Sequence, residues 1–476
     1  MPTEISTTAS GAGARGRAGQ LPFQTDFSAE ELSARRAAIM RDMAGGVAVL
    51  QGAAELRGFE PFRQHNDFYY LTGVEVPHAY LLLHADKGEA VLYLPPHNPR
   101  HEASDGLTLC ADDGDFVRSR TGIQAVRPSA QLSGDLAGLR DLWVMRSPAE
   151  NYRECQDTLR IHRAALATDP LGRPPAEHVH LLARLAELCP DAEFHNLSPL
   201  LQRRRLLKSP AEQLLMRYAG LLSAAAFSAV ISVARDDIYE YQLAAMSDFV
   251  FHTQGARGSS YRAITPTGEN IWMMHYWRNN CRLKNGELVL YDHAPDFRYY
   301  TSDIGRMFPV NGKFSAVQRE LYGFVVEYHQ LLLALIKPGR LATEILREAA
   351  ETMRPRIDRR RWSKEIYRVG ALKLMESQRP LSHSVGMAVH DGGRYAAAPL
   401  APGLVFAVDP ELVIPEERLY IRVEDTVLVT ETGINNLTGT VPVGVHAMEA
   451  FIAAHQEDDA MGVITSFEEW AADVGS

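Results

Sequence analysis

The chain has 476 residues, of which 46% are hydrophobic, 23% charged and 8% aromatic. This apolar content is enough for two or three packed cores, so a disordered, collagen-like or coiled-coil protein is excluded. With 49 Lys and Arg against 59 Asp and Glu, the formal net charge is -10, which argues against a nucleic-acid partner. The 4 cysteines form no close CxxC pair. We therefore expect a reducing, cytoplasmic location.

The first half of the chain predicts a leader followed by an α/β domain. Residues 1–22 are rich in Gly, Ala and Thr and contain no apolar stretch for a secretory signal, so we expect a disordered leader. Residues 23–195 mix helical and strand-like runs, which predicts an α/β domain. The expected elements are a helix over residues 30–41 and strands over residues 47–51, 80–84 and 90–94.

A helix start signal marks the domain boundary, which we place near residues 190–208. Ser209 is a natural N-cap, Pro210 suits the first helical position, and Glu212 completes a capping box. The apolar stretch 219–234 is shorter than the roughly 20 residues that span a bilayer. It therefore predicts a buried helix and no membrane association. We expect the basic run of residues 203–208 to form a solvated face.

The second half, residues 205–455, predicts an α+β domain. Helical patterns cover residues 211–234, 316–336 and 343–353, and strand patterns cluster after residues 287 and 403. Residues 456–476 are predicted to be an acidic tail.

Residues 286–310 predict a β-hairpin with two aspartates on one face. A turn centred between Phe297 and Arg298 would place Asp292 directly opposite Asp303. Like charges facing each other across a strand pair are destabilising, and a pair of divalent metal ions has the size and charge to neutralise them. Alternatively, one aspartate is a turn residue and the other is solvated.

Three further candidate ligands lie downstream, in or beside short apolar strands: His383, Asp409 and Glu424. Apolar strands rarely bury a carboxylate unless it is paired or binds a metal. The four carboxylates, with Asp292 and Asp303, would balance the charge of two divalent ions, while the histidine would bind in its neutral form.

These segments resemble the aminopeptidase P group of the pita-bread metallopeptidases, which also include prolidase and methionine aminopeptidase. The resemblance covers most of the chain. It is carried by FRQHNDFYYLTGVEVPHAYLLL near the N-terminus, by the eleven-residue step between the two aspartates, and by SDIGRMFPVNGKF, SHSVGMAVHD and RVEDTVLVTETGINNLT. It implies an α+β fold in which a C-terminal pita-bread metallopeptidase domain follows an α/β N-terminal domain.

The resemblance also implies roles for individual residues. The metal ligands would be Asp292, Asp303, His383, Asp409 and Glu424. Asp303 and Glu424 would bridge the two ions. His275 and His390 would contact the substrate and the transition state, and Arg422 would support the metal-binding carboxylates.

Oxygen-rich ligation with one imidazole suits manganese first, with cobalt, zinc or iron as alternatives. A hydroxide bridging two such ions would be the nucleophile, and Asp409 would carry the proton to the leaving nitrogen. The expected reaction removes the N-terminal residue that precedes proline in a peptide. N-terminal domains of this group often mediate dimers or tetramers, so we expect a homo-oligomer.

The sequence departs from the family pattern at four positions around the expected site. Asp409 stands where glutamate is usual, and Glu411 replaces a glycine. His293 replaces a small residue, and Arg379 occupies the place of a further histidine. These positions leave two alternatives open: a metalloenzyme of the same fold with a non-peptide, biosynthetic substrate, or a catalytically silent peptide-binding module. Residues 268–277 are bulkier than usual and are expected to pack in the core.

Overall fold

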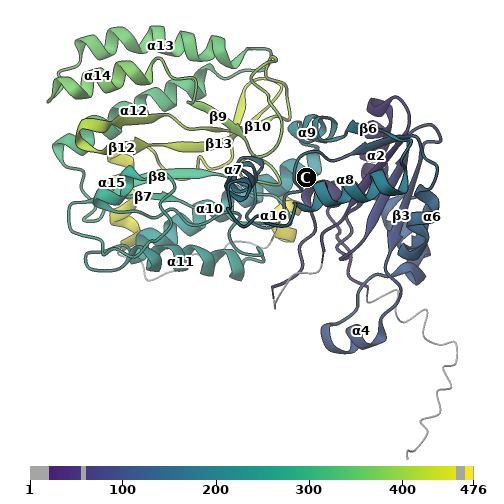
Figure 1. Ribbon diagram of the computed structural model, residues 1–476. Helices are drawn as coiled ribbons and strands as arrows, with labels where there is room; N and C mark the ends of the chain where they lie inside the picture. Colours follow the sequence, from purple (N-terminus) through teal and green to yellow (C-terminus); the bar gives the residue numbers. More distant parts are fainter. Residues whose placement is uncertain (1–20, 55–59, 457–466, 475–476) are drawn as a thin grey trace, which may run out of the picture. The chain divides into compact units, whose positions relative to one another are not determined.

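The computed structural model describes residues 21–54, 60–456 and 467–474. The chain forms two compact units, drawn in purple to blue and in teal to yellow in Figure 1. The N-terminal unit ends at Arg204, and the C-terminal unit begins at Arg205. The short segment Tyr152–Asp157 belongs to the C-terminal unit. The leader predicted for residues 1–22 falls almost entirely outside the described residues.

The N-terminal unit is built on a mixed six-stranded sheet with the order β4-β3-β2-β1-β5-β6. Its strands are β1 (Val47–Gln51), β2 (Tyr80–His84), β3 (Glu89–Leu94), β4 (Ala125–Pro128), β5 (Asp141–Val144) and β6 (Glu193–Asn196). The helices of this part of the chain are α2 (Ala29–Met43), α3 (Asn66–Thr72), α4 (Pro99–Asp105), α5 (Gly114–Thr121), α6 (Leu132–Leu136), α7 (Gln156–Ala167), α8 (Glu177–Leu188) and α9 (Ser198–Leu206). The first two predicted strands are confirmed residue for residue, and the third begins one residue earlier than expected.

The C-terminal unit is built on an antiparallel sheet with the order β7-β8-β13-β10-β9, to which β14 adds beside β13. Its strands are β7 (Leu288–Asp292), β8 (Ile304–Pro309), β9 (Leu381–Ser384), β10 (Val405–Val408), β13 (Glu424–Val429) and β14 (Ile434–Asn436). A separate hairpin consists of β11 (Glu411–Ile414) and β12 (Leu419–Arg422).

The helices of the C-terminal unit flank these strands. They are α10 (Pro210–Val233), α11 (Glu240–Thr253), α12 (Ala316–Leu335), α13 (Ala342–Arg359), α14 (Glu365–Leu374), α15 (Val445–Gln456) and α16 (Phe467–Val474). Figure 1 shows α12, α13 and α14 along one side of the strands and α10 and α11 along the other. One large core of aliphatic and aromatic side chains fills the space between helices and strands. In the predicted acidic tail, Trp470 of α16 packs on Tyr218, with ring centroids 5.5 Å apart.

Helix α10 begins at the predicted capping box. The Ser209 hydroxyl accepts a hydrogen bond from the backbone N–H of Glu212, and the Glu212 carboxylate accepts one from the backbone N–H of Ser209 at 2.9 Å. By length and composition α10 could cross a membrane, but 72% of its most apolar window is buried inside the protein. The prediction of a buried core helix is confirmed.

The basic run before α10 is not a solvated face, so that expectation is wrong for two of its residues. Arg205 and Lys208 are both buried, at 2% and 4% exposure. Their charges meet the buried carboxylate of Asp391, with Lys208 Nζ 3.5 Å from Asp391 Oδ2 and Arg205 in direct ion pairing. A buried carboxylate provides the compensation that makes burial of two cations tolerable.

The hairpin of β7 and β8 forms, but its register differs from the prediction. Asp292 pairs with Gly305 rather than with Asp303. The reason is the turn: Arg298 and Tyr299, both at positive φ, are its central residues, so its centre lies one residue later than expected. The shift moves the pairing by two residues, which keeps both aspartates on the same face of the sheet.

Candidate metal centre

The five candidate ligands lie at adjacent positions of the C-terminal sheet. Asp292 is the last residue of β7, Asp303 directly precedes β8, Glu424 begins β13, Asp409 follows β10, and His383 lies in β9. The four carboxylates are 1% to 6% exposed. Because β7, β8, β13, β10 and β9 are consecutive neighbours in the sheet, residues that are 132 positions apart in the chain are brought together.

Three of these residues form a compact cluster. His383 Nε2 lies 3.4 Å from Asp303 Oδ2 and 3.8 Å from Glu424 Oε1. All three ligand atoms lie within 4.8 Å of one another. One ion of ordinary coordination radius could contact all three residues after small adjustments of the side chains.

Arg422, the last residue of β12, places its guanidinium among the other carboxylates. It is ion-paired with Asp292 through Nη2. Its Nη1 lies 3.5 Å from Glu424 Oε2 and its Nε lies 3.8 Å from Asp409 Oδ1. A single guanidinium cannot balance four carboxylates, so the cluster keeps an excess of negative charge.

Tyr261 contacts two of the carboxylates, and nothing in the sequence pattern singled it out. Its hydroxyl lies 2.6 Å from Asp292 Oδ1 and 2.8 Å from Asp303 Oδ1. A phenol carries one proton and can donate to only one of these oxygens at a time. Tyr261 lies in a loop far from both aspartates in sequence, so only the folded chain reveals this contact.

Burial and mutual repulsion disfavour the charged form of the carboxylates in the cluster. Burial and the neighbouring Asp292 carboxylate raise the pKa of Asp303 well above its ordinary value. Burial and the Glu424 carboxylate raise the pKa of Asp409. Burial and the Asp303 carboxylate raise the pKa of Glu424. The pKa of His383 is lowered by burial and by the neighbouring His390, which favours the neutral imidazole that binds metals.

Two further observations fit divalent metal ions. Asp409 Oδ1 and Glu424 Oε2 are buried without a hydrogen-bond partner, although buried polar atoms are almost always satisfied. Gly305 pairs with Asp292 on one side and with Glu424 on the other, and a Cβ atom there would lie 2.8 Å from Glu424 Cβ. Glycine at this position therefore lets the Glu424 side chain and Arg422 Nε lie close against the backbone opposite Asp292. The donor set, four carboxylates and one imidazole, suits hard or borderline divalent ions.

The two histidines expected beside the metals lie near the cluster. The His390 ring is 4.0 Å from the His383 ring between centroids, and the His275 ring is 6.4 Å from that of His390. Burial lowers the pKa of His275, although the Asp292 carboxylate acts in the opposite direction. Both imidazoles are therefore within reach of a molecule held at the cluster.

The four positions that depart from the family pattern have defined surroundings. His293 is fully buried, with its ring against Phe251 of α11 and its Nε2 3.7 Å from Asp248 Oδ1. Burial lowers the pKa of His293 to about 4, against the opposing charge of Asp248. Among the described residues it belongs to no cluster that could hold a metal, so it packs behind the site.

Arg379 and Glu411 contact each other. Arg379 Nη1 lies 3.7 Å from Glu411 Oε2, and the Glu411 carboxylate also accepts a hydrogen bond from the Tyr420 hydroxyl at 2.7 Å. The backbone N–H of Asp409 donates to the carbonyl of Pro380 at 2.9 Å. Three of the four departures are therefore neighbours in space, at the same edge of the site.

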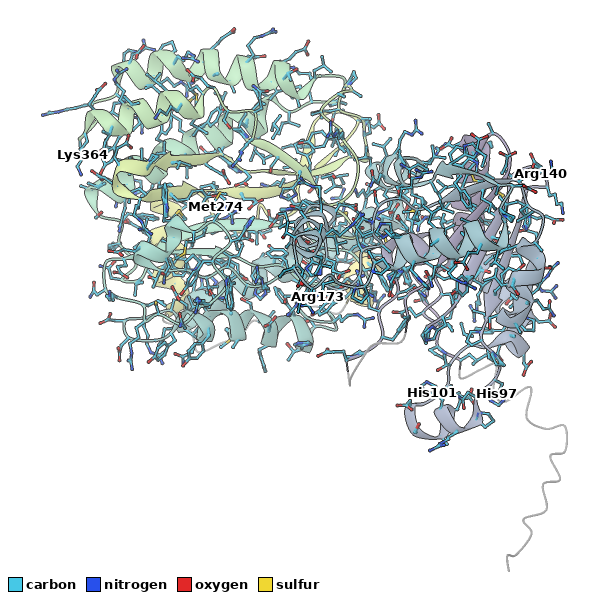
Figure 2. All side chains as sticks on the ribbon, viewed as in Figure 1. His97, His101, Arg140, Arg173, Met274 and Lys364 are labelled. Carbon is cyan, nitrogen blue, oxygen red and sulfur yellow. The ribbon has the colours of Figure 1, made fainter. Side chains whose placement is uncertain are left out.

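The bulky segment of residues 268–277 is only partly core, which corrects the expectation. Trp272 and Met274 pack against the core, whereas Met273 and Trp277 are 42% and 56% exposed. Of these residues, Met274 is labelled in Figure 2. Met273, His275 and Trp277 line a cavity of about 360 Å³. The exposed side chains thus form a wall beside one of the candidate catalytic histidines.

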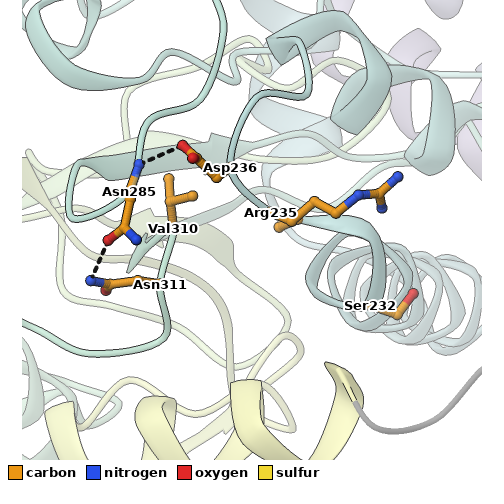
Figure 3. Close-up of a pocket in the computed structure, with 7 residues that line it drawn as sticks. Ser232, Arg235, Asp236, Asn285, Val310 and Asn311 are labelled. Carbon is orange, nitrogen blue, oxygen red and sulfur yellow. Dashed lines mark hydrogen bonds between the residues drawn. The ribbon is translucent and has the colours of Figure 1, made fainter.

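Two other polar clusters are weaker candidates for a functional site. A hollow of about 410 Å³ lies at the far end of β7 and β8. Figure 3 shows its lining, in which the backbone N–H of Asn285 donates to Asp236 and the side chain of Asn311 donates to Asn285. These polar groups satisfy one another. His101 of α4 and His97, which precedes this helix (Figure 2), are paired with acidic neighbours at the surface.

Comparison with known proteins agrees with this geometry. The sequence matches metallopeptidase family M24 over residues 214–431 and the aminopeptidase P N-terminal domain over residues 32–141. It is 30% identical over 461 residues to the Xaa-Pro aminopeptidase of Escherichia coli K12, covering 90% of this chain and 99% of the relative. Human Xaa-Pro aminopeptidase 3 is 30% identical over 406 residues, which cover 82% of this chain and 76% of the human protein.

Solved structures give the same result. The low-pH form of Escherichia coli aminopeptidase P has a TM-score of 0.73 at 28% identity and covers 91% of this chain and 100% of that chain. The zinc-substituted enzyme in complex with product has a TM-score of 0.73 at 29% identity, with the same coverage.

Fold and site together define a two-domain metallopeptidase with a pita-bread domain that follows an α/β domain, as the sequence predicted. The chain belongs to the aminopeptidase P group of metallopeptidase family M24 and is an enzyme of that class.

Proposed function

We propose that this protein is a dinuclear metal-dependent aminopeptidase that removes the N-terminal residue from Xaa-Pro peptides. The observation that carries the proposal is the cluster of four buried carboxylates and one imidazole, which contains a single guanidinium. Two of the carboxylate oxygen atoms in this cluster have no hydrogen-bond partner. Membership of the Xaa-Pro aminopeptidase family supports the choice of peptide substrate.

Two divalent ions would be held by Asp292, Asp303, His383, Asp409 and Glu424. When bound, the ions would supply a hydroxide nucleophile and polarise the scissile carbonyl. Manganese is the first candidate because four of the five ligands offer oxygen.

The remaining residues would act on the substrate. Because the His275 and His390 rings both lie beside the cluster, both can contact the substrate, and His275 can donate a hydrogen bond to the oxyanion that develops on the scissile carbonyl. Asp409 would carry a proton to the leaving nitrogen; the raised pKa of this carboxyl, caused by burial and by Glu424, supports that role. Arg422 would hold Asp292 in place through its ion pair.

A direct test combines metal analysis with a matched pair of peptides. Purified protein loaded with Mn²⁺ is expected to hold about two ions per chain and to cleave Xaa-Pro peptides in preference to the same peptides with alanine in place of proline. Cleavage of neither peptide by well-metallated protein would refute the peptidase assignment. Protein that binds no metal would instead indicate a silent peptide-binding module.

One observation favours a second candidate, a metalloenzyme of the same fold that acts on a small carboxylic acid. Arg379 is 73% exposed although it lies 3.7 Å from Glu411, so its guanidinium has surface left for another carboxylate. Free carboxylic-acid metabolites belong in the same metal-replete screen. Turnover of such an acid, without cleavage of Xaa-Pro peptides, would select this candidate.

We also propose a cytoplasmic location. In the folded chain none of the four cysteines forms a disulfide, a state that a reducing compartment maintains.

A further inference from the structure

The segment Tyr152–Asp157 is part of the C-terminal unit although it precedes that unit by some fifty residues in sequence. Arg153 anchors it: Nε donates to the backbone carbonyl of Ser259 at 3.2 Å, and Nη2 donates to the Ser259 hydroxyl at 2.6 Å. Cys155 is buried against Ala388 and Val389. The segment is therefore fixed beside the stretch that carries His390.

Asp157 follows directly and contacts His390. Its Oδ2 lies 2.6 Å from Nδ1 of the His390 ring, a distance typical of a charge-assisted hydrogen bond. The His390 ring in turn lies 4.0 Å from that of His383 between centroids. Asp157 thus contacts a residue at the edge of the candidate metal centre.

This contact has a chemical consequence for the imidazole. A neutral histidine carries one N–H, and a carboxylate at Nδ1 holds that proton on Nδ1. The ring is then fixed in orientation, and Nε2 is the nitrogen left for the substrate. A carboxylate that orients a catalytic imidazole in this way lowers the barrier without touching the reacting atoms.

We propose that Asp157 is a positioning residue of this enzyme, which acts through the hydrogen bond to Nδ1 of His390. The proposal rests on the proposed function, in which His390 contacts the substrate. It also gives the segment Tyr152–Asp157 a part in the active site, although these residues lie within the N-terminal domain that the sequence predicts and carry no predicted role.

The alternative is a purely structural role, because Asp157 lies in the first turn of α7, where acidic residues stabilise a helix. The substitution Asp157→Asn distinguishes the positioning role from the purely structural role. Asparagine keeps the shape of aspartate, but its amide can donate to Nδ1 and so favour the wrong tautomer. We expect Asp157→Asn in the manganese-loaded protein to lower kcat on an Xaa-Pro peptide by about 10- to 100-fold, with KM, metal content and melting temperature unchanged.

A matched control and a double mutant sharpen the test. Asp141 and His195 form another Asp–His pair, 3.2 Å apart and outside the metal centre, so Asp141→Asn is expected to leave kcat unchanged. In a His390→Ala background, Asp157→Asn should cost no further activity. An undiminished kcat in Asp157→Asn, or an equal loss with and without His390, would overturn the proposal.

A readout independent of activity separates this proposal from the proposed function. In protein labelled with ¹⁵N-histidine, the signals missing from His390→Gln identify the ring of His390. In the wild type these His390 signals are expected to show the ring proton on Nδ1. In Asp157→Asn they are expected to show a change of tautomer, with the proton on Nε2. If the wild type cleaves no Xaa-Pro peptide but this change is seen, the peptidase assignment fails and the positioning contact stands. Identical His390 signals in both proteins would refute the contact itself.

Discussion

Glu424 and Asp425 are adjacent in β13 and are both about 1% exposed, yet their surroundings differ. Asp425 accepts hydrogen bonds from Arg306 and from the Thr438 hydroxyl, each at 2.6 Å, and these contacts help to lower its pKa in spite of burial. Glu424 has an oxygen with no hydrogen-bond partner and a raised pKa caused first by burial. Because side chains alternate along a strand, one acid points to a structural ion pair and the other to the candidate metal centre.

Asp303 is the residue whose loss should be most damaging. We expect Asp303→Asn to lower metal content and to reduce activity by more than about 100-fold, because removal of a ligand exceeds the effect of removing a supporting residue. Metal analysis by mass spectrometry and peptide assays measure both quantities. Asp358→Asn, an exposed carboxylate beside Arg368, is the control. Full activity in Asp303→Asn would show that this carboxylate holds no metal.

Substitutions of Asp409 test whether the pocket is adapted to aspartate in place of the glutamate that is usual in the family. Glutamate is one methylene longer, and Asp409 Oδ1 has no hydrogen-bond partner in its present position. If the protein is an Xaa-Pro aminopeptidase, Asp409→Glu should keep or raise kcat at unchanged metal content. Asp409→Asn, which removes the charge, should lose activity. A sharp fall in kcat for Asp409→Glu with normal metal content would instead show that the pocket is built around aspartate.

At the scale of elements, the turn between β7 and β8 shows where sequence reasoning reached its limit. The hairpin predicted for residues 286–310 forms, and its first strand, β7, is a continuous apolar run that ends in an aspartate. The register was wrong by two residues, since Arg298 and Tyr299 adopt positive φ values of 49° and 75°. Neither residue type signals that conformation, which glycine or asparagine would have marked.

Two glycines, one in α10 and one in α12, allow a prediction of how the free energy of unfolding changes on substitution. In α10, a Cβ atom on Gly220 would lie 2.2 Å from the Leu437 carbonyl oxygen, whereas in α12 a Cβ on Gly323 would meet only Val445 at 3.7 Å. Gly220→Ala is therefore expected to destabilise the protein by about 1–3 kcal/mol. Gly323→Ala should stabilise it by about 0.5–1 kcal/mol, because glycine is costly in a helix interior. Denaturant unfolding of both variants measures the difference, and equal free energies would contradict it.

At the scale of the whole molecule, metal binding should be linked to protons. Burial, together with neighbouring carboxylates, raises the pKa values of Asp303, Asp409 and Glu424 in the metal-free protein. Protons therefore compete with metal for these groups. Raising the pH deprotonates them, so the apparent affinity for Mn²⁺ should increase with pH until it passes their raised pKa values, and then level off.

Calorimetry in two buffers of different ionisation enthalpy measures this linkage. Binding of Mn²⁺ to the wild type should release protons. Binding to Asp303→Asn should release fewer protons, because this variant lacks one of the carboxyl groups with a raised pKa. Heats that are independent of the buffer would show that the cluster is already deprotonated without metal.

The sequence by itself determined the local elements, the family and the identity of the five candidate ligands. Apolar runs, the capping box at Ser209 and the acids in buried strands are local signals, and each can be recognised within a few residues. The burial of Arg205 and Lys208 against Asp391 was missed, because nothing near a basic run indicates a carboxylate almost two hundred residues away.

The tertiary structure alone decided the contacts between distant segments. It brought Tyr261 to Asp292 and Asp303, Arg379 to Glu411, and Asp157 to His390. Each of these contacts depends on the pairing of strands or the path of a loop. That pairing is set by the burial of the whole core rather than by the residues in contact, so the local sequence carries no mark of it.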